Sequence, residues 1–530
     1  MAYDYQPFPY VPPAGLRGPE PRHPVVIIGA GPIGLALAID LAQRGVRSVV
    51  LDDNNVVSVG SRAICWAKRS LEILDRLGVG ERMLEKGVTW QVGRLFHGQD
   101  EVYSFDLLPE DGHKYPAFIN LQQYYVEQYL VERAQELGVD IRFKNDVVAH
   151  RDMGDHVVLT VRTPDGDYAL EASYLAACDG ARSPTRNRMG LPFEGQTFEE
   201  HFLIVDVELA QSPFETDVPE RWFWFNPPFH AGQSALLHQQ PDNIYRIDLQ
   251  LGPDTDPLEE ATEAKVRPRL EAILGDRPYR LDWMSVYKFR CARLDRFVHG
   301  RVLFIGDSAH VVSPFGARGG NGGIQDVDNI GWKLAAVLQG VADADLIETY
   351  NAERVHGSAE NILNSTRATN FMTPKSPIEV LFRDEVLRMA HDHPFARRLI
   401  NSGRLSLPCS LGGFDLQTPG VAPVMPGQAA VDAPLEDGWL IEEVQGRFLL
   451  VGFGAVDLPL VDGVDRLGVG HGAGYRVVSP KGPAAFDRYG TGRAYLFRPD
   501  GHVAAVFDAP TVESVTQARD RALGHAKVTA

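Results

Sequence analysis

In the first part of the chain, two short apolar runs have the pattern of buried strands, and the segment between them has the pattern of a helix. Val25–Ile28 is a β-branched run with the pattern of a strand buried on both faces, and RSVVLD further along predicts a second such strand. Between them, Leu35, Ala38 and Leu41 supply the packing face of a predicted helix, which Gly45 is well placed to end. Strand, helix and strand in this order predict an α/β fold with a parallel sheet.

The middle of the chain has a different pattern, in which alternating and aromatic segments are separated by proline and acidic turns. HFLIVDVELA, ERWFWFNPPFH, QSALLHQQPDNIYRIDLQL and RLDWMSVYKF have this character and predict an antiparallel sheet. Before them, DHVVLTVRTPDGDYALEASYLAACDG predicts a hairpin that turns at Asp165-Gly166. After them, Val302–Ile305 predicts another buried strand, and LIETYNAERVHGSAENILNSTRATNFM predicts a long helix.

Charge and cysteine content narrow the range of partners. A formal net charge of −18 and a pI near 5.4 argue against nucleic-acid binding and a polybasic membrane anchor, since both need clustered positive charge. No signal peptide is evident, and no stretch approaches the roughly 18 apolar residues that span a bilayer. The four cysteines form no CxxC pair and no metal-ligand spacing. We therefore expect a cytoplasmic protein with a small-molecule partner and no metal.

Three glycines follow the first predicted strand in a GxGxxG spacing. In a dinucleotide-binding fold the first makes a tight turn, the second lets the backbone approach a pyrophosphate, and the third lets the helix pack closely on the strand. An acidic side chain at the end of the second strand accepts from the ribose hydroxyls, and Asp52 holds that place with Asp53 beside it. The predicted dinucleotide contacts are Gly29, Gly31, Pro32, Gly34, Asp52 and Asp53.

Two further motifs end buried strands far downstream. In YLAACDGARSPTR the strand ends at Asp179-Gly180, and in GRVLFIGDSAH it ends at Gly306-Asp307. Together with GxGxxG, over roughly residues 24 to 360, this set resembles the single-component FAD-dependent aromatic hydroxylases, the para-hydroxybenzoate hydroxylase and phenol hydroxylase type of flavoprotein monooxygenase. In that family the aspartate of the GD motif binds the ribityl chain of FAD, a role that the resemblance gives to Asp307.

The resemblance also implies a reaction. NAD(P)H, as a transient co-substrate, would reduce tightly but non-covalently bound FAD, O2 would add to form a C4a-hydroperoxide, and its distal oxygen would attack a phenolic or related aromatic ring. The protein would supply positioning, exclusion of water and help in forming a phenolate. The alternatives are a same-fold oxidase or reductase, a monooxygenase on a larger polyketide-like or antibiotic substrate, and a non-enzymatic flavin-binding regulatory protein.

The same resemblance implies a domain organisation. We expect an α/β chain in which a Rossmann-like FAD-binding domain is interrupted by an antiparallel substrate sheet. The proline-rich FDLQTPGVAPVMPGQ separates a last, thioredoxin-like unit that lacks CxxC, so an interface or stability role is expected. The sequence does not fix the oligomeric state; a homodimer is the candidate, because acidic enzymes of this size often dimerise. The predicted parts are an N-terminal arm over 1–23, the FAD-binding domain over 24–200 and, with long helices, over 296–400, the substrate sheet over 201–295, and the thioredoxin-like domain over 420–530.

Further cofactor contacts are predicted from the same family positions. Arg62, in GSRAICWAKRS, and Gln123, in QQYYVEQYL, stand where the family places an arginine and a glutamine near FAD. The loop PFGARGGNGG precedes a predicted helix whose unpaired amides, near Asn321 and Gly322, suit the negative charge of a reduced flavin. His310 is expected to be structural. The contacts added here are Arg62, Gln123, Asp179, Gly306, Asp307, Pro314, Gly319, Asn321 and Gly322.

Candidate catalytic residues come from the loop SPFGAR and the middle sheet. Pro314 and Gly316 match family positions beside the isoalloxazine ring. The residues expected to line the substrate pocket are Trp224, Phe225, His238, Arg246 and Tyr287. Of these, His238, Arg246 and Tyr287 complete the catalytic set, and no single base can be named. Phenol hydroxylase-like members have an acidic residue where this chain has SRAIC, which puts substrate deprotonation by that route in doubt.

Overall fold

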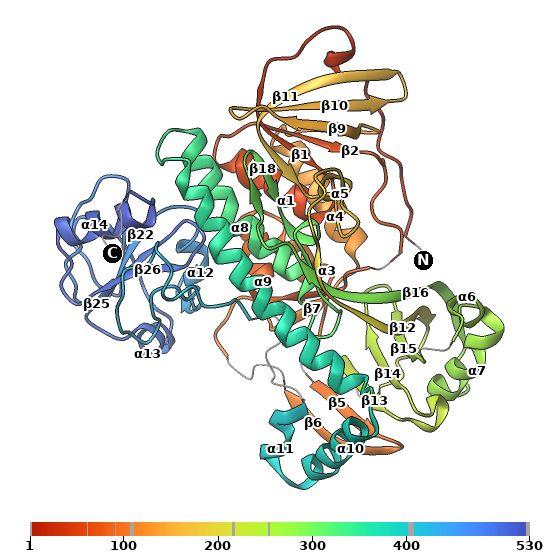
Figure 1. The fold of residues 1–530 in the computed structure, drawn as a ribbon. Coiled ribbons are helices and arrows are strands. Elements are labelled where there is room, and N and C mark those ends of the chain that lie inside the picture. The colour runs from red at the N-terminus through yellow and green to blue at the C-terminus, as the bar shows by residue number, and fades with distance from the viewer. Residues whose placement is uncertain are drawn as a thin grey trace.

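The computed structural model describes residues 3–60, 62–90, 92–106, 111–214, 218–252, 255–400 and 407–525. Residues 1–2 of the predicted arm and 526–530 of the predicted C-terminal domain lie outside these ranges. Figure 1 shows a sheet with helices at the top, a second sheet at the lower right and the C-terminal unit at the left. The long helix α9 (Asp345–Met372) runs diagonally between them.

The first sheet carries the elements predicted around the GxGxxG turn. Its order is β17-β18-β11-β1-β2-β8, and the run from β18 to β8 is parallel. β9 and β10 extend β11 as antiparallel strands, and the pairing of Thr163 with Gly166 confirms the hairpin predicted at Asp165-Gly166. The strands are β1 (His23–Ile28), β2 (Ser48–Asp52), β8 (Asp140–Phe143), β9 (Asp146–Asp152), β10 (Val157–Thr163), β11 (Gly166–Ala177), β17 (Val298–His299) and β18 (Val302–Phe304).

Helix α1 lies at the centre of the helices that pack on this sheet. Every residue from Gly34 to Leu41 is buried, because α1 packs against α4 and α8 as well as the sheet. α1 ends at Gln43, and Gly45 has a φ of 75°, which confirms the predicted helix end. The helices of this part are α1 (Pro32–Gln43), α2 (Lys68–Arg76), α3 (Gly80–Lys86), α4 (Gln123–Glu136), α5 (Pro184–Arg188) and α8 (Gly319–Leu338).

The second sheet contains the strands predicted from the aromatic middle segments. Its order is β19-β16-β12-β15-β14-β13-β5-β6, and every neighbouring pair is antiparallel except β13 and β5. β5 and β6 come from the 24–200 range, and a parallel partner from a distant segment leaves no local turn signal in the sequence. The strands are β5 (Val92–His97), β6 (Asp100–Asp106), β12 (Glu194–Leu209), β13 (Glu220–Phe225), β14 (Ser234–Gln239), β15 (Ile244–Leu251), β16 (Tyr279–Arg293) and β19 (His310–Val311).

The two faces of the second sheet have different neighbours. One face packs through Leu203 and Ile247 on Leu270 of the helical segment α6 (Pro257–Glu260) and α7 (Glu263–Leu274). The other, which we call the site face, packs through Phe202 on Phe315 of the loop before α8, with a ring distance of 5.2 Å. α10 (Pro377–Asp392) and α11 (Pro394–Ile400) pack beside β5 and β6, and a small sheet of β3 (Cys65–Ala67), β7 (Phe118–Asn120) and β4 (Val88–Thr89) joins the two larger ones.

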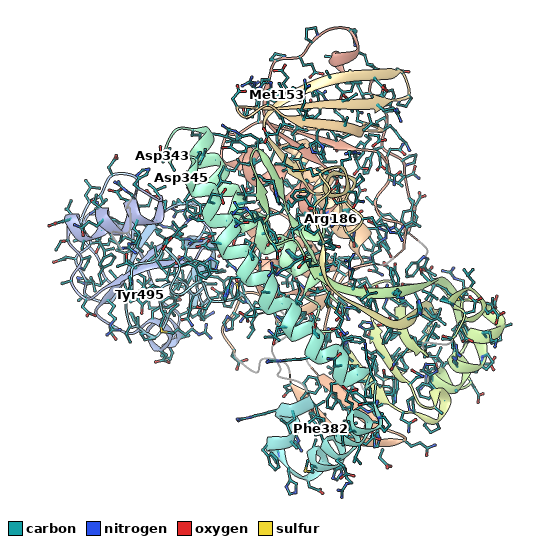
Figure 2. All side chains as sticks on the ribbon, viewed as in Figure 1. Met153, Arg186, Asp343, Asp345, Phe382 and Tyr495 are labelled. Atoms are coloured by element: carbon teal, nitrogen blue, oxygen red, sulfur yellow. The ribbon has the colours of Figure 1, made fainter. Side chains whose placement is uncertain are left out.

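The C-terminal unit is built on a five-stranded sheet in the order β24-β23-β22-β25-β26. Tyr495, buried in its core, marks this unit in Figure 2. Antiparallel pairing of β25 with β26 forms a hairpin around Asp500-Gly501. Its elements are β20 (Pro434–Leu435), β21 (Gly438–Trp439), α12 (Leu440–Glu443), β22 (Leu449–Phe453), β23 (Asp465–Val469), β24 (Arg476–Val478), α13 (Ala484–Tyr489), β25 (Arg493–Phe497), β26 (Val503–Phe507) and α14 (Val512–Ala522).

Buried ion pairs join the C-terminal unit to α8 and α9. Arg498, which is fully buried, donates to Glu353 of α9 at 2.7 Å and pairs with Asp500 at 2.5 Å. Lys333 of α8 pairs with the same Glu353 at 2.7 Å, and the indole of Trp332 donates to Asp500 at 3.2 Å. Each buried charge therefore has an opposite charge beside it, as a buried ion network requires.

Candidate active site

The turn after β1 has the geometry that each glycine of the GxGxxG motif was expected to provide. Gly29 has a φ of 104°, and a Cβ there would lie 2.5 Å from the carbonyl oxygen of Cys178. A Cβ on Gly34 would lie 2.0 Å from the carbonyl oxygen of Gly29, so a larger residue would separate α1 from β1. A Cβ on Gly31 would meet no described atom within 4 Å. The open side of the turn is therefore at Gly31, next to Pro32 at the first position of α1.

Asp52 ties the end of β2 to this turn. Its Oδ2 accepts from the amide of Ala30 at 2.6 Å, and its Oδ1 accepts from the amide of Asn54 at 2.8 Å. Burial raises the pKa of Asp52 to about 6. Asp53, the next residue, is exposed. Both acids thus lie at the carboxyl end of β2, beside the glycine turn.

A buried carboxylate from α8 holds the GD turn. Gly306 has a φ of 68°, and its amide donates to Asp326 at 3.0 Å. His310 lies 2.7 Å from the same carboxylate, and Arg354 of α9 donates to it at 2.7 Å. His310 therefore has the structural environment expected of it. Asp326 and Arg354 were not predicted, because they are distant in sequence and only the fold brings them to the turn.

The side chain of Asp307 projects from this turn without a protein partner. No hydrogen-bond donor within the described ranges reaches its carboxylate, although burial raises its pKa. Asp307 is half-buried, and a partly desolvated acceptor of this kind fits a ligand with hydroxyl groups.

The DG motif lies next to the GD turn. Asp179 accepts from the amide of Thr185 through Oδ2, while its buried Oδ1 has no partner in the described chain. Arg186, labelled near the middle of the molecule in Figure 2, donates to the carbonyl oxygen of Ser308 at 2.9 Å. The fold therefore brings together the two motifs that lie more than a hundred residues apart in the sequence.

The loop between β19 and α8 has an unusual backbone. Gly316 has a φ of 93°, and Ala317 has a φ of 51°, a conformation that L-residues rarely adopt outside constrained sites. The amide of Ala317 donates to Pro314 at 3.0 Å, which closes the loop. α8 begins at Gly319, and the amide of Gly322 already donates to Arg318. The helix start thus offers the amides of residues 319–321, and the expectation of an unpaired amide at Gly322 is corrected.

Asn321 links the start of α8 to the small joining sheet. Its side-chain oxygen accepts from the amide of Ala67 at 2.9 Å, and its Nδ2 donates to the carbonyl oxygen of Cys65 at 2.9 Å. The segment SRAIC leads through β3 into α2, which begins at Lys68. Cys65 therefore lies between the α8 start and the second sheet.

Arg62 lies in the loop between β2 and β3, and Gln123, at the start of α4, forms hydrogen bonds with the same loop. Gln123 accepts from the amide of Ala63 at 3.1 Å and donates to Ser58 at 3.0 Å. Arg62 has an exposed side chain, and its carbonyl oxygen accepts from Arg246 of the second sheet at 3.3 Å. The structure thus places these two residues between the first sheet and the site face.

A row of polar side chains, two of them arginines, crosses the site face. The register pairs Arg221 of β13 with His238 of β14, His238 with Arg246 of β15, and Arg246 with Asp206 of β12. Residues directly paired across strands share a face, so these four side chains lie side by side. Arg246 forms an ion pair with Asp206 at 3.0 Å. Arg221, the residue that sequence reasoning missed, sits within the aromatic segment ERWFWF.

The remaining predicted lining residues divide between the two faces. Phe225 and Tyr287 lie on the site face, since Phe225 pairs with Ser234 beside Gln250, and Tyr287 pairs with Phe202. Trp224 does not join them. Its side chain lies in the core on the opposite face, because alternate residues of a strand point to opposite sides.

Comparison with known proteins shows the family. The model described as FAD binding domain matches residues 22–365, more than half of the chain, which therefore belongs to this family. The 12-dehydrotetracycline 5-monooxygenase/anhydrotetracycline 6-monooxygenase of Streptomyces rimosus is 30% identical over 512 residues, 91% of this chain and 95% of that relative. The rifampicin monooxygenase of Streptomyces venezuelae is 34% identical over 349 residues, 65% of this chain and 70% of that relative.

A solved structure shows the same fold over almost the whole chain. The flavin-dependent monooxygenase PieE, in complex with FAD and substrate, superposes with a TM-score of 0.80 at 22% identity, covering 96% of this chain and 100% of PieE. The chain is a flavoprotein monooxygenase of the aromatic hydroxylase type, with FAD as its cofactor. No helix in the described ranges is both long and apolar enough to cross a lipid bilayer.

Proposed function

We propose that this monooxygenase uses NAD(P)H and O2 to hydroxylate a phenolic or enolic ring of a polycyclic aromatic compound. The observation that carries the proposal is the sequence match to a relative that is named for two tetracycline-type substrates. The match covers 95% of that relative's length. The two arginines of the row on the site face support the proposal, because Arg221 and Arg246 favour a substrate with an acidic hydroxyl group. A small phenol is the alternative within the same reaction.

The residues that would hold FAD fit the group chemically. Gly31 leaves open the space that a pyrophosphate needs. Asp179 has a buried oxygen without a partner in the described chain, and no described donor reaches the half-buried carboxylate of Asp307, so both carboxylates suit hydroxyl groups. The amides of residues 319–321 would face the flavin ring with Pro314 and Gly316. When bound, FAD supplies the oxygen-transfer chemistry. The chain contributes orientation, a dry site face and charge beside the substrate hydroxyl.

The proposal is tested with the purified holoenzyme. NADH and NADPH oxidation, oxygen uptake and product mass are recorded across simple phenols, hydroxybenzoates and hydroxyanthraquinones. Stimulated oxidation with a product heavier by one oxygen atom supports the proposal, and the compounds that are converted distinguish a polycyclic from a small substrate. Cofactor consumption with every compound returned unchanged would overturn it.

A further inference from the structure

Six buried polar atoms without partners gather on or beside the site face. Within the described ranges they are Nε of Arg221, both ring nitrogens of His238, Oδ1 of Asp248, and Oε1 of Gln122 and of Gln240. Buried polar groups are almost always hydrogen-bonded in folded proteins. A cluster of orphaned donors and acceptors, on the sheet face that meets the loop before α8, therefore indicates a polar ligand.

Arg221 is the cation of this cluster that lacks a counter-ion. It is only 8% exposed, and no described carboxylate lies within ion-pair distance of it. Its Nη1 lies 3.5 Å from Sγ of Cys65, and its guanidinium lies 5.4 Å and 5.1 Å from the rings of Trp90 and Phe223. Buried charges in proteins are normally paired, so this environment favours a ligand that brings a negative charge.

His238 lies between Arg221 and Arg246 in the row. Its Nε2 is 3.5 Å from Oδ2 of Asp248, which projects from the same face two residues beyond Arg246. Burial and then Arg221 lower the pKa of His238 to about 4, so the imidazole is neutral near pH 7. Burial alone would raise the pKa of Asp248, but His238 and the two arginines hold it below its usual range. Nε2 makes no hydrogen bond at this distance, but the negative charge of the nearby carboxylate favours a proton on Nε2, which leaves Nδ1 as an acceptor.

Resting on the proposed function, we propose that His238 removes the proton from a ring or enol hydroxyl of the substrate, that Arg221 binds the oxyanion formed, and that Asp248 is the positioning residue. The O–H bond breaks, an N–H bond forms at Nδ1, and the electron pair stays on the substrate oxygen. The imidazolium lies beside the carboxylate of Asp248. The oxyanion offsets the repulsion between the imidazolium and the two arginines, and because the proton moves within the site, the net charge of the site does not change on transfer.

His238, on the second sheet, thus takes the role of the acidic residue that phenol hydroxylase-like members have where this chain has SRAIC. The groups that face His238 are Arg221 on β13, Arg246 and Asp248 on β15, and Cys65 near Arg221. Burial raises the pKa of the Cys65 thiol, so it stays neutral and does not compete as a base. Cys65 also connects the row to Asn321 at the start of α8, which places the oxyanion site next to the predicted flavin loop.

The test uses 1,4-dihydroxyanthraquinone as the probe, because its monoanion absorbs to the red of oxidised flavin. Titrated into the wild-type holoenzyme between pH 6 and pH 9, it is expected to show the anion band at a pH at least about one unit below its ionisation in water. His238→Gln and Asp248→Asn are expected to return the ionisation of the bound probe toward its solution value. Arg221→Met is expected to weaken probe binding at least tenfold, and Arg221→Lys to restore part of it.

Matched variants separate these effects from general damage to the sheet. His150→Gln changes a partly buried strand histidine of the first sheet, and Arg94→Met changes an arginine that pairs with Glu220 on the opposite face of the second sheet. Both should leave the anion band unchanged. The inference is overturned if the wild-type enzyme does not ionise the probe, or if folded, flavin-containing His238→Gln and Asp248→Asn both ionise it as the wild type does. If the wild-type enzyme still forms hydroxylated products when the inference fails, the proposed function remains supported.

Discussion

Two glycines of the turn after β1 separate a cofactor-binding role from a folding role. A Cβ added at Gly31 meets no described atom within 4 Å, and its φ of −78° and ψ of −177° suit any residue. A Cβ added at Gly34 lies 2.0 Å from the carbonyl oxygen of Gly29 and 3.2 Å from Cγ2 of Ile27. Gly31→Ala should therefore disturb the ligand, and Gly34→Ala should disturb the protein.

The size of each effect follows from what the added methyl group meets. At Gly31 it enters the space proposed for the pyrophosphate, and losing one charge-assisted hydrogen bond costs about 1.5–3 kcal/mol, or a roughly 10- to 150-fold weaker FAD affinity. Apoprotein stability should change by less than about 1 kcal/mol, since lower chain entropy offsets a poorer N-cap. At Gly34 the helix must move from the strand, and overpacking of this kind costs about 1–3 kcal/mol in the free energy of unfolding.

The assay measures both quantities on both variants. FAD is removed, its affinity is measured by flavin fluorescence on reconstitution, and apoprotein stability is measured by urea unfolding. The expected pattern is a large affinity loss with unchanged stability for Gly31→Ala, and lower stability for Gly34→Ala. Normal FAD affinity in Gly31→Ala, or a stability loss equal to that of Gly34→Ala, would refute the proposed approach of the pyrophosphate to this turn.

Three further predictions concern Asp307, the buried ion pairs of Arg498 and the titration of His238. Asp307→Ala should purify largely without yellow flavin, whereas Asp343→Ala, at an exposed site just before α9 (Figure 2), should keep it in absorbance spectra. Arg498→Met should lower the free energy of unfolding by about 3–5 kcal/mol, against less than about 1 kcal/mol for Arg476→Met at an exposed ion pair. The pKa of His238 is about 4 in the folded protein, below its unfolded value of about 6.5. The free energy of unfolding should therefore fall by up to about 3 kcal/mol as the pH drops from about 6.5 to about 4. His238→Gln should flatten this pH dependence when unfolding is measured in urea.

The local parts of the fold could be predicted because their signals are local. The strand, glycine turn and helix around Gly31 follow from β-branched residues and glycine spacing within about 25 residues. The hairpins at Asp165-Gly166 and Asp500-Gly501 follow from turn residues between alternating strands. The entry of β5 beside β13 could not be predicted in this way, since parallel pairing between distant segments depends on the whole fold.

The site was predicted less completely because its chemistry depends on register. ERWFWF is aromatic on both faces, so its pattern does not show whether Trp224 or Phe225 faces the site. The same ambiguity concealed Arg221, whose proposed role follows only from its pairing with His238 and from the lack of a counter-ion among the described residues. A charged residue inside an aromatic strand was the available signal, since burial of such a residue calls for a partner.

Consecutive residues of α9 connect the C-terminal unit to the GD turn. Glu353 accepts from Arg498 of that unit, while Arg354 donates to Asp326, which in turn holds the amide of Gly306. Both ion pairs are buried. A shift of α9 would therefore separate the charges of these pairs, and an unpaired buried charge costs several kcal/mol. The C-terminal unit is therefore connected to the GD turn through adjacent residues of α9, a contact that suits the expected interface or stability role and requires no CxxC.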